Sequence, residues 1–182
     1  IILPEHDNDL RAQSVIRSKG ALHYITETQI INSQDKKKNI YVSLILVGPN
    51  KYYSFDNQEI IQIIDEILKK FMKHNNRFRI VSSRRTPSKI IHLIKEKFKN
   101  LNNVEIDNSL DKSKYINTLA NSEILVVTSD SISMISEAAI TGKTIYVAYL
   151  KPSKNDYRFK RFFKSFEEMG TIKSLKNDEK VW

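Results

Sequence analysis

The sequence predicts an α/β fold built on a doubly wound parallel sheet, and three observations lead to this prediction. From residue 40 onward, short apolar segments of β-forming residues alternate with amphipathic helical segments. Ile124–Thr128 is apolar throughout, which is typical of a central parallel strand covered on both faces, and Ile40–Val47 is rich in β-forming residues. Small polar loops follow several of these segments. Because such sheets bind ligands beside the carboxyl ends of their strands, these loops are the first candidates for function.

Each element has its own local signal. Ile40–Val47 ends at the breaker cluster Gly48-Pro49-Asn50, and Asp56 can cap a helix that runs to about Lys73. A later helix is expected to open at Thr86-Pro87, with Thr86 as its N-cap. Five strands are expected between Ile40 and Leu150. The remaining expected elements are strands at Phe78–Ser82, Val104–Ile106, Ile124–Thr128 and Thr144–Leu150, and helices around Tyr115–Ala120, Ser131–Ile140 (stopped by Gly142) and Tyr157–Met169, the last of which is basic, rich in Phe and ended by Gly170.

Residues 1–39 fit this pattern less well and are interpreted as an arm and linker, the remnant of a preceding domain, ahead of the main domain at residues 40–182. Ile1–Leu3 is interpreted as a lone strand and Asn32–Lys38 as a polar linker. A lone strand leaves its backbone groups without partners. Ile1–Leu3 is therefore expected to pair with an outer sheet edge or with a second copy of the chain, which would give a dimer through the arm.

Composition narrows the class of protein. The net charge is +9, but the cationic residues are scattered among acidic ones, and the chain carries no RNA-binding aromatic motif or zinc finger. We therefore expect solvated basic faces and no nucleic-acid partner, with peripheral contact to an anionic membrane surface as the alternative. The absence of cysteine excludes disulfides and thiolate catalysis. No apolar run reaches the ~18 residues of a membrane span. A cytoplasmic location, with the inner face of a membrane as the alternative, is expected.

Two of the strand-end loops carry groups suited to binding an anion. In the first, Gly48 allows close approach of the backbone, Asn50 tolerates unusual dihedral angles and Lys51 supplies charge. The second, which runs from Ser83 through Arg84 and Arg85 to Thr86, places two guanidinium groups before a helix N-terminus. An ordinary strand-to-helix turn and a cap with solvated arginines are the respective structural alternatives. Adjacent side chains diverge, so one of the two arginines is expected to face the site.

The third loop carries the most information. Polar residues crowd the step from a buried strand into a helix, where hydroxyl groups and the free N–H groups of the helix favour phosphate. Glu137 lies four residues after Ser133 and shares its helix face, so its carboxylate could accept hydrogen bonds from ribose hydroxyls. Simple N-capping is the alternative, but one cap does not need so many polar groups. The candidate binding residues here are Thr128, Ser129, Asp130, Ser131, Ser133, Met134 and Glu137.

Hydrolase and metalloenzyme chemistry are not supported by the sequence. Ser131 does not lie in a G-x-S-x-G elbow. The four histidines, His6, His23, His74 and His92, include no pair with metal-ligand spacing. We therefore expect no metal and no cofactor, and the sequence does not identify catalytic residues.

Four segments resemble the C-terminal half of the mitochondrial fission "elongate mitochondria" family, which comprises plant proteins and many bacterial homologues. They are KGALHYIT (Lys19–Thr26), VGPNKYYSFD (Val47–Asp56), SSRRTP (Ser82–Pro87) and VTSDSISMISEAAITGKTIYV (Val127–Val147), and they occur in the same order over nearly the whole chain. The pattern S-E-A-x-x-x-G-K-x-x-x-V is also similar to the sugar-nucleotide half of GT-B glycosyltransferases, which is a Rossmann-like domain.

The resemblance implies a nucleotide sugar as ligand. It implies that Glu137 meets the ribose, that Ser131 and Ser133 meet the phosphates, and that Gly48, Asn50 and Lys51 close over the ligand. Val47 departs from the pattern, because a second glycine is expected there. The expected function is donor binding in a GT-B-like glycosyltransferase that acts on a cell-envelope acceptor, with catalysis depending on a partner N-terminal domain. A GT-B-like sugar-nucleotide epimerase and a non-catalytic adaptor that recruits division or fission machinery remain alternatives.

Overall fold

The computed structural model describes residues 1–7, 11–35, 41–72 and 76–176. Its main feature is a six-stranded, wholly parallel sheet in the order β5-β4-β3-β6-β7-β8. Numbered along the chain within this sheet, the order is 3-2-1-4-5-6, which is that of a Rossmann-type doubly wound fold. Strand order therefore reverses between β3 and β6, at the centre of the sheet.

The expected elements from residue 41 to residue 169 are all present, with boundaries close to those expected. The strands of the sheet are β3 (Tyr41–Leu46), β4 (Arg77–Ser82), β5 (Val104–Asp107), β6 (Ser122–Thr128), β7 (Ile145–Ala148) and β8 (Ile172–Ser174). The helices between them are α2 (Asn57–Phe71), α3 (Ser88–Phe98), α4 (Lys112–Asn121), α5 (Ile132–Ala139) and α6 (Tyr157–Glu168). The sheet has one strand more than the five counted between Ile40 and Leu150, because β8 follows the last helix.

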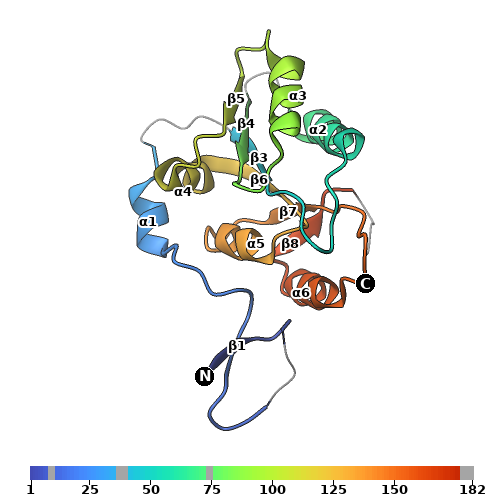
Figure 1. The fold of residues 1–182 in the computed structure, drawn as a ribbon. Helices are drawn as coiled ribbons and strands as arrows, with labels where there is room; N and C mark the ends of the chain where they lie inside the picture. The colour runs from blue at the N-terminus through green and yellow to red at the C-terminus, as the bar shows by residue number, and fades with distance from the viewer. Residues whose placement is uncertain (8–10, 36–40, 73–75, 177–182) are drawn as a thin grey trace.

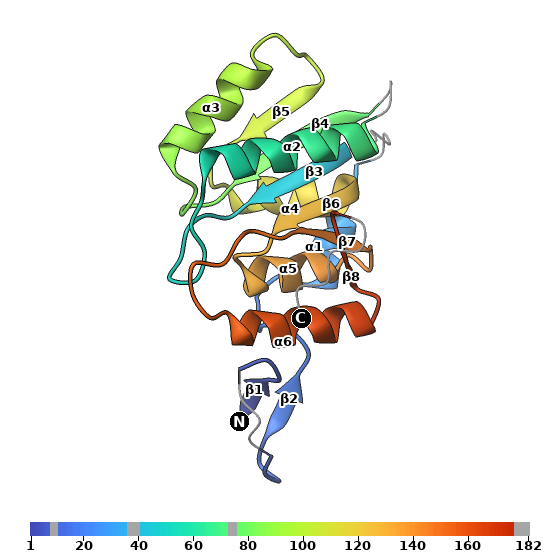
Figure 2. The same ribbon diagram turned by 90° about the vertical axis from the view of Figure 1, so that its right-hand side faces the viewer.

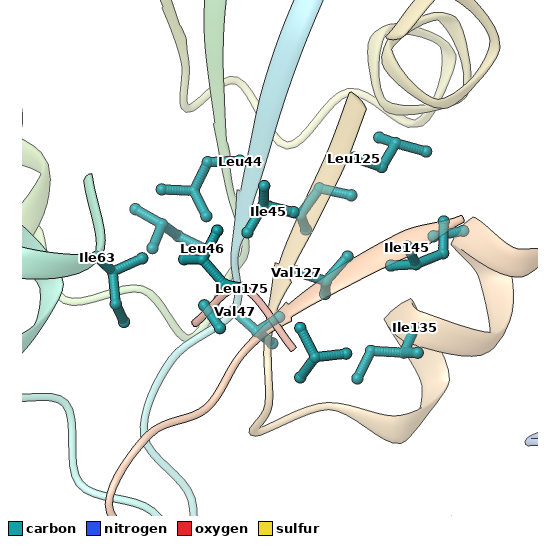
Figure 3. Packing of buried hydrophobic residues seen from close by; sticks show 14 of the residues in the cluster. Leu44, Ile45, Leu46, Val47, Ile63, Leu125, Val127, Ile135, Ile145 and Leu175 are labelled. Atoms are coloured by element: carbon teal, nitrogen blue, oxygen red, sulfur yellow. The ribbon is translucent and has the colours of Figure 1, made fainter. Parts of the chain in front are cut away.

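Helices cover both faces of the sheet (Figure 1). α2 and α3 lie on one face, and α4 and α5 on the other. Strand β3 is buried at every position, and its side chains alternate between the two layers. Figure 3 shows Leu44 and Leu46 on the side of Ile63 of α2, while Ile45 lies on the side of Val127 and Ile135. Two-sided burial explains why this strand is apolar at every position except Ser43.

The N-terminal arm differs from expectation. Ile1–Leu3 is not a lone strand: β1 (Ile2–Pro4) pairs in parallel with β2 (Ile16–Ser18) in a separate two-stranded sheet. This small sheet lies beside α6, away from the six-stranded sheet (Figures 1 and 2). Because β1 finds its backbone partner within the chain, the unpaired-strand argument for a dimer is removed.

A helix that the sequence analysis missed, α1 (Glu27–Asn32), ends where the polar linker Asn32–Lys38 was expected to begin. Thr26 starts α1 with a capping box, in which its side chain accepts from Gln29 N and the Gln29 side chain accepts from Thr26 N. α1 packs against α4. Ile40, Lys73, His74 and the linker residues 36–38 lie outside the described residues.

Thr86 is not the N-cap of α3. The helix begins at Ser88 with Pro87 at the cap position and without a side-chain cap. Thr86 Oγ1 instead accepts from Ser83 N and lies 2.9 and 2.8 Å from the carbonyl oxygens of Leu46 and Val47. The threonine therefore ties the β4 loop to the end of β3. Within the ranges given above, the longest apolar helical stretches are all too short or too polar to cross a bilayer.

Candidate functional site

The three polar loops lie along one edge of the sheet. Leu46 of β3 is in register with Ser82 of β4, and Ile45 is in register with Val127 of β6. All three strands run in the same direction, so the loops that follow them meet at the carboxyl edge, beside the point where strand order reverses. This is where doubly wound sheets bind ligands. The prediction that the three loops share one rim is confirmed.

Asp130 joins two of these loops from a buried position. Its Oδ2 accepts from Gly48 N at 2.8 Å and lies 3.8 Å from the Arg85 guanidinium, and its carbonyl accepts from Asn50 Nδ2 at 2.8 Å. The side chain is 1% exposed. Burial raises the pKa of the Asp130 carboxyl to about 6, against the opposing effects of its hydrogen bonds and of Arg85. Asp130 thus holds the loops together through Oδ2 and its carbonyl, while its Oδ1 is buried without a hydrogen bond to the described residues.

Glycine is required at position 48 because the loop after β3 and the loop after β4 pass close to each other there. Its φ is +138°, and a Cβ there would lie 2.3 Å from the Arg85 carbonyl oxygen. Asn50 closes its own turn, because its Oδ1 accepts from Tyr52 N and Tyr53 N. Lys51 is exposed and stacks over the Tyr52 ring at 4.8 Å. In this structure the first loop is organised by internal contacts, and none of the three residues lines the cavity described below.

Thr128 and Ser129 are also internal. Both are fully buried. Thr128 Oγ1 accepts from Val47 N at 3.1 Å, and Ser129 Oγ accepts from Leu150 N at 2.9 Å. These hydroxyls therefore align the ends of neighbouring strands. Much of the polar crowding seen in the sequence is used to hold the sheet edge.

A cavity of about 410 Å³ opens at this edge, between the loops and helices α4 and α5. We call it the edge cavity. Of the predicted residues it is lined by Ser83, Arg84, Arg85, Ser131, Met134 and Glu137. Both arginines line it, so the expectation that one of them turns away is wrong. The lining residues that sequence reasoning missed are Val47, Val81, Ser82, Asp107, Leu110, Asp111, Lys112 and Tyr115.

Glu137 lies in the second turn of α5 and is half-buried in the cavity wall. Tyr115 of α4 donates a hydrogen bond from its hydroxyl to Glu137 Oε2 at 2.9 Å. Oε1 accepts no hydrogen bond from the residues that the structure describes. Burial raises the pKa of the Glu137 carboxyl, while Tyr115, His23 and Lys112 act in the opposite direction. The carboxylate is therefore oriented on one oxygen and available on the other.

The start of α5 supplies backbone donors. Ser131 is the N-cap, and its Oγ accepts from Met134 N at 3.3 Å. The N–H groups of Ile132 and Ser133 donate no hydrogen bond to any described residue, as expected for a helix first turn. The Ser133 side chain is exposed and does not line the edge cavity. A ligand at this helix start would thus meet the backbone N–H of Ser133 and not its hydroxyl within the cavity.

The edge cavity combines cations and carboxylates. Arg84, Arg85 and Lys112 are its basic lining residues, and Asp107, Asp111 and Glu137 are its acidic ones. Asp111 caps α4 by accepting from Ser113 N and Lys114 N, and hydrogen bonds from Ser113 lower the pKa of its carboxyl. The lining residues between the end of β5 and α4 also follow the carboxyl end of a parallel strand, as the predicted loops do. Asp107 is the last residue of β5, and the loop after it could have been found on that ground.

The lysine of the motif S-E-A-x-x-x-G-K-x-x-x-V, Lys143, has a structural role. Lys143 Nζ donates to the carbonyls of Ala120 and Ser122, at the junction of α4 and β6. Burial lowers the pKa of its ammonium group. Lys143 is therefore a cap for the C-terminus of α4 and not part of the edge cavity. No cluster of three or more His, Cys, Asp or Glu that could hold a metal ion occurs among residues 1–7, 11–35, 41–72 and 76–176.

Comparisons with known proteins agree with this architecture. The sequence profile of the family described as Mitochondrial fission ELM1 matches residues 1–182. The chain is 32% identical over 173 residues to the uncharacterized protein RP120 of Rickettsia prowazekii (strain Madrid E), covering 90% of the chain and 48% of that protein. It is 28% identical over 168 residues to the mitochondrial fission protein ELM1 of Arabidopsis thaliana, covering 88% of the chain and 39% of that protein. The chain thus spans about half, or less, of these relatives.

Among solved structures, the chain is similar to a protein described as a UDP-N-acetylglucosamine 2-epimerase from Listeria monocytogenes. The TM-score is 0.51 at 16% identity, and the likeness covers 85% of the chain and 36% of that protein. At this identity the likeness shows the fold alone. The fold is a Rossmann-like half of the GT-B type.

Proposed function

The chain belongs to the mitochondrial fission ELM1 family, and from this premise we propose that it is the nucleotide-sugar-binding half of a GT-B-like glycosyltransferase. The observation that carries the proposal is Glu137 in the wall of the edge cavity. Its Oε2 is held by Tyr115 and its Oε1 is available to accept hydrogen bonds from the hydroxyls of a ribose. A preoriented carboxylate is well suited to a diol, because its charge-assisted hydrogen bonds are stronger than neutral ones.

The diphosphate would lie between the start of α5 and the loop after β4. There it meets the N–H groups of Ile132 and Ser133 together with the guanidinium groups of Arg84 and Arg85. A helix N-terminus and arginines both favour phosphate, and Arg can bind it with two parallel hydrogen bonds. In sugar transfer this arrangement would stabilise the charge that develops on the diphosphate leaving group. In the whole protein, the sugar would be transferred to a cell-envelope acceptor. The proposal places the acceptor and the catalytic base in a partner N-terminal domain.

One observation favours a second candidate function. The Arabidopsis relative is named as a mitochondrial fission protein, so the fold could serve as a non-catalytic adaptor that recruits division or fission machinery. An adaptor has no requirement for the edge cavity to bind a nucleotide sugar. The two functions therefore differ in a direct binding measurement.

The test is calorimetric titration of the 182-residue chain with UDP-N-acetylglucosamine, UDP-glucose, ADP-glucose, GDP-mannose and dTDP-glucose. The proposal expects saturable one-to-one binding of at least one of them, with a rise in melting temperature. Arg84→Gln combined with Arg85→Gln should weaken this binding. The matched pair Lys69→Gln and Lys95→Gln, exposed on α2 and α3, removes the same charge and should leave it unchanged. Absence of binding to all five ligands would favour the adaptor.

A further inference from the structure

Three neighbouring segments at the carboxyl edge of the sheet gather exposed cationic side chains. They are residues 47–56 after β3, residues 83–89 from the loop after β4 into α3, and residues 149–155 after β7. Together they contain six cations and a single carboxylate, that of Asp56. The six cations, all of them exposed, are Lys51, Arg84, Arg85, Lys89, Lys151 and Lys154. We call these six residues the basic rim.

The three segments are neighbours because the chain joins them directly. Tyr53 forms an antiparallel bridge with Pro152, which pairs the segment after β3 with the segment after β7. Lys51 and Lys154, two positions beyond this bridge, come from facing stretches of the pair. The segment after β4 meets the segment after β3 at Gly48, where the two backbones touch. Figure 2 shows the loops after β3 and β7 close together at the carboxyl ends of the strands.

Buried contacts hold the paired segments in place. Tyr53 is 1% exposed, and its hydroxyl donates to Oδ2 of the equally buried Asp156 at 2.7 Å. The rings of Tyr52 and Tyr53 both pack edge-to-face on Phe159 of α6, with centroids 5.4 and 5.1 Å apart. The lysines therefore stand on an ordered support, so a partner need not order these segments when it binds.

Most of the basic rim has no counterion. Arg85 lies 3.8 Å from Asp130, whereas the other five cations form no ion pair with the residues that the structure describes. Lys51 lies over the Tyr52 ring, which leaves its charge in place. Asp56 uses its carboxylate to cap α2. The carboxylates that line the edge cavity belong to β5, the loop after it and α5, outside these segments. The rim is therefore a local excess of positive charge.

Exposed tyrosine beside these cations favours a membrane surface as the partner. Tyr157, at the start of α6 just after the third segment, is 64% exposed. Tyr52 is half-buried under Lys51. Tyrosine rings are enriched at the level of lipid headgroups. A cluster of about four to eight Lys and Arg is typical of contact with acidic lipids, and the basic rim falls within this range.

We propose that the basic rim docks the chain on an anionic membrane surface. The lysines and Arg84 contact lipid phosphates, and Tyr157 lies among the headgroups. Because the basic rim and the edge cavity share the carboxyl edge of the sheet, docking brings the cavity close to the bilayer, where a cell-envelope acceptor would be held. The membrane contact itself does not depend on a nucleotide sugar in the edge cavity.

The test is sedimentation of the 182-residue chain with vesicles of phosphatidylcholine alone, or of phosphatidylcholine mixed equally with phosphatidylglycerol. The wild-type chain should sediment with the acidic vesicles only, and added salt should release it. Lys89→Gln, Lys151→Gln and Lys154→Gln, made together, remove three cations of the rim that do not line the edge cavity. This triple variant should bind the acidic vesicles about tenfold more weakly, or worse.

The matched control removes the same charge elsewhere on the surface. Lys69→Gln, Lys95→Gln and Lys173→Gln change exposed positions on α2, α3 and β8, and together they should alter vesicle binding less than about twofold. Equal losses in the two triple variants, equal binding of wild type to neutral and acidic vesicles, or no binding to acidic vesicles overturns the proposal. Melting curves confirm that each variant is folded.

Two further measurements separate this proposal from the proposed function and from a nucleic-acid partner. In calorimetry, the Lys89/Lys151/Lys154 variant should keep the wild-type affinity for a nucleotide sugar, whereas the Arg84/Arg85 variant should not. Vesicle binding without nucleotide-sugar binding leaves the membrane contact in place and removes the proposed function, and the converse result does the reverse. A single-stranded oligonucleotide that releases the chain from acidic vesicles and requires the same three lysines assigns the rim to nucleic acid and overturns the membrane contact.

Discussion

Glu137→Gln should weaken ligand binding without lowering the stability of the fold, and both expectations follow from the structure. The substitution keeps the shape of the side chain, and the amide oxygen can still accept from the Tyr115 hydroxyl. What is lost is the charge on the oxygen that faces the edge cavity. Hydrogen bonds to a charged group contribute about 1.5–3 kcal/mol, compared with about 0.5–1.5 kcal/mol for neutral ones. The difference of about 1.4 kcal/mol for one ribose contact corresponds to about a tenfold loss in affinity.

The stability change should have the opposite sign. Burial raises the pKa of Glu137 in the folded chain above its unfolded value. A carboxyl with a raised folded pKa favours folding below the unfolded pKa, and this contribution is lost as pH rises through the folded pKa. At pH 7 the charged Glu137 carboxylate therefore lowers the stability of the folded chain. A neutral glutamine removes this penalty, so the melting temperature should stay the same or rise slightly.

The assay is calorimetric titration of wild type and Glu137→Gln with whichever nucleotide sugar binds, together with thermal melts at pH 7. Glu96→Gln on α3 is the matched control, because it makes the same chemical change at an exposed helix position. Tyr115→Phe removes the orienting hydroxyl and should weaken binding by less than Glu137→Gln does. An unchanged affinity in Glu137→Gln would refute the ribose contact. A clear drop in melting temperature would instead assign Glu137 to the fold.

Three further predictions concern the sheet edge and its supports. Gly48→Ala should lower the free energy of unfolding by about 2–4 kcal/mol in denaturant titrations, because its Cβ meets the Arg85 carbonyl, while Gly142→Ala, which has open space, should lower it by about 1 kcal/mol. The pKa of Asp130 in the folded chain is about 6, above its unfolded value, so its contribution to stability should fall as pH rises from about 4 to 6. Asp130→Asn should flatten this part of the plot of unfolding free energy against pH, and an unaltered plot would contradict the raised pKa of Asp130. Lys143→Met should lower stability by about 1–3 kcal/mol, measured by urea unfolding, because the carbonyls of Ala120 and Ser122 lose their donor, and an unchanged urea midpoint would show that the contact is not needed.

The parallel sheet was predictable because burial on both faces leaves a direct mark in the sequence. The end of β6, Ile124–Thr128, is apolar at almost every position, which is typical of a parallel strand covered on both faces. The N-terminal arm was harder to predict, since three-residue strands such as Ile16–Ser18 carry no periodic signal. Short α1 was missed for the same reason, although Thr26 and Gln29 form a capping-box pattern that could have indicated its start.

Within the site, the residue types predicted which side chains lie at the sheet edge better than they predicted what those side chains bind. Serine, threonine and aspartate at a strand end serve equally to bind a phosphate or to satisfy neighbouring backbone groups, and the sequence alone does not distinguish these uses. Thr128 and Ser129 satisfy Val47 N and Leu150 N, which come from distant parts of the chain. Only the register of β3, β6 and β7 shows that these hydroxyls are already used. Tyr115 was missed because its role depends on α4 lying beside α5.

Asp130 and Glu137 show how one edge of a sheet divides its carboxylates between structure and binding. Burial raises the pKa of both, so each carries a cost when it is charged. At Asp130 this cost is offset in part by Gly48 N and by Arg85, and these contacts join the two loops. At Glu137 it is offset in part by Tyr115, and one oxygen remains open to the edge cavity. A ligand hydroxyl would add a donor to the open oxygen of Glu137, whereas Asp130 uses Oδ2 for the contacts between the loops and keeps Oδ1 buried without a hydrogen bond among the described residues. Removing the charge at Asp130 should therefore weaken the contacts to Gly48 and Arg85 while also removing the cost of burying that charge, whereas at Glu137 it should weaken ligand binding without lowering stability.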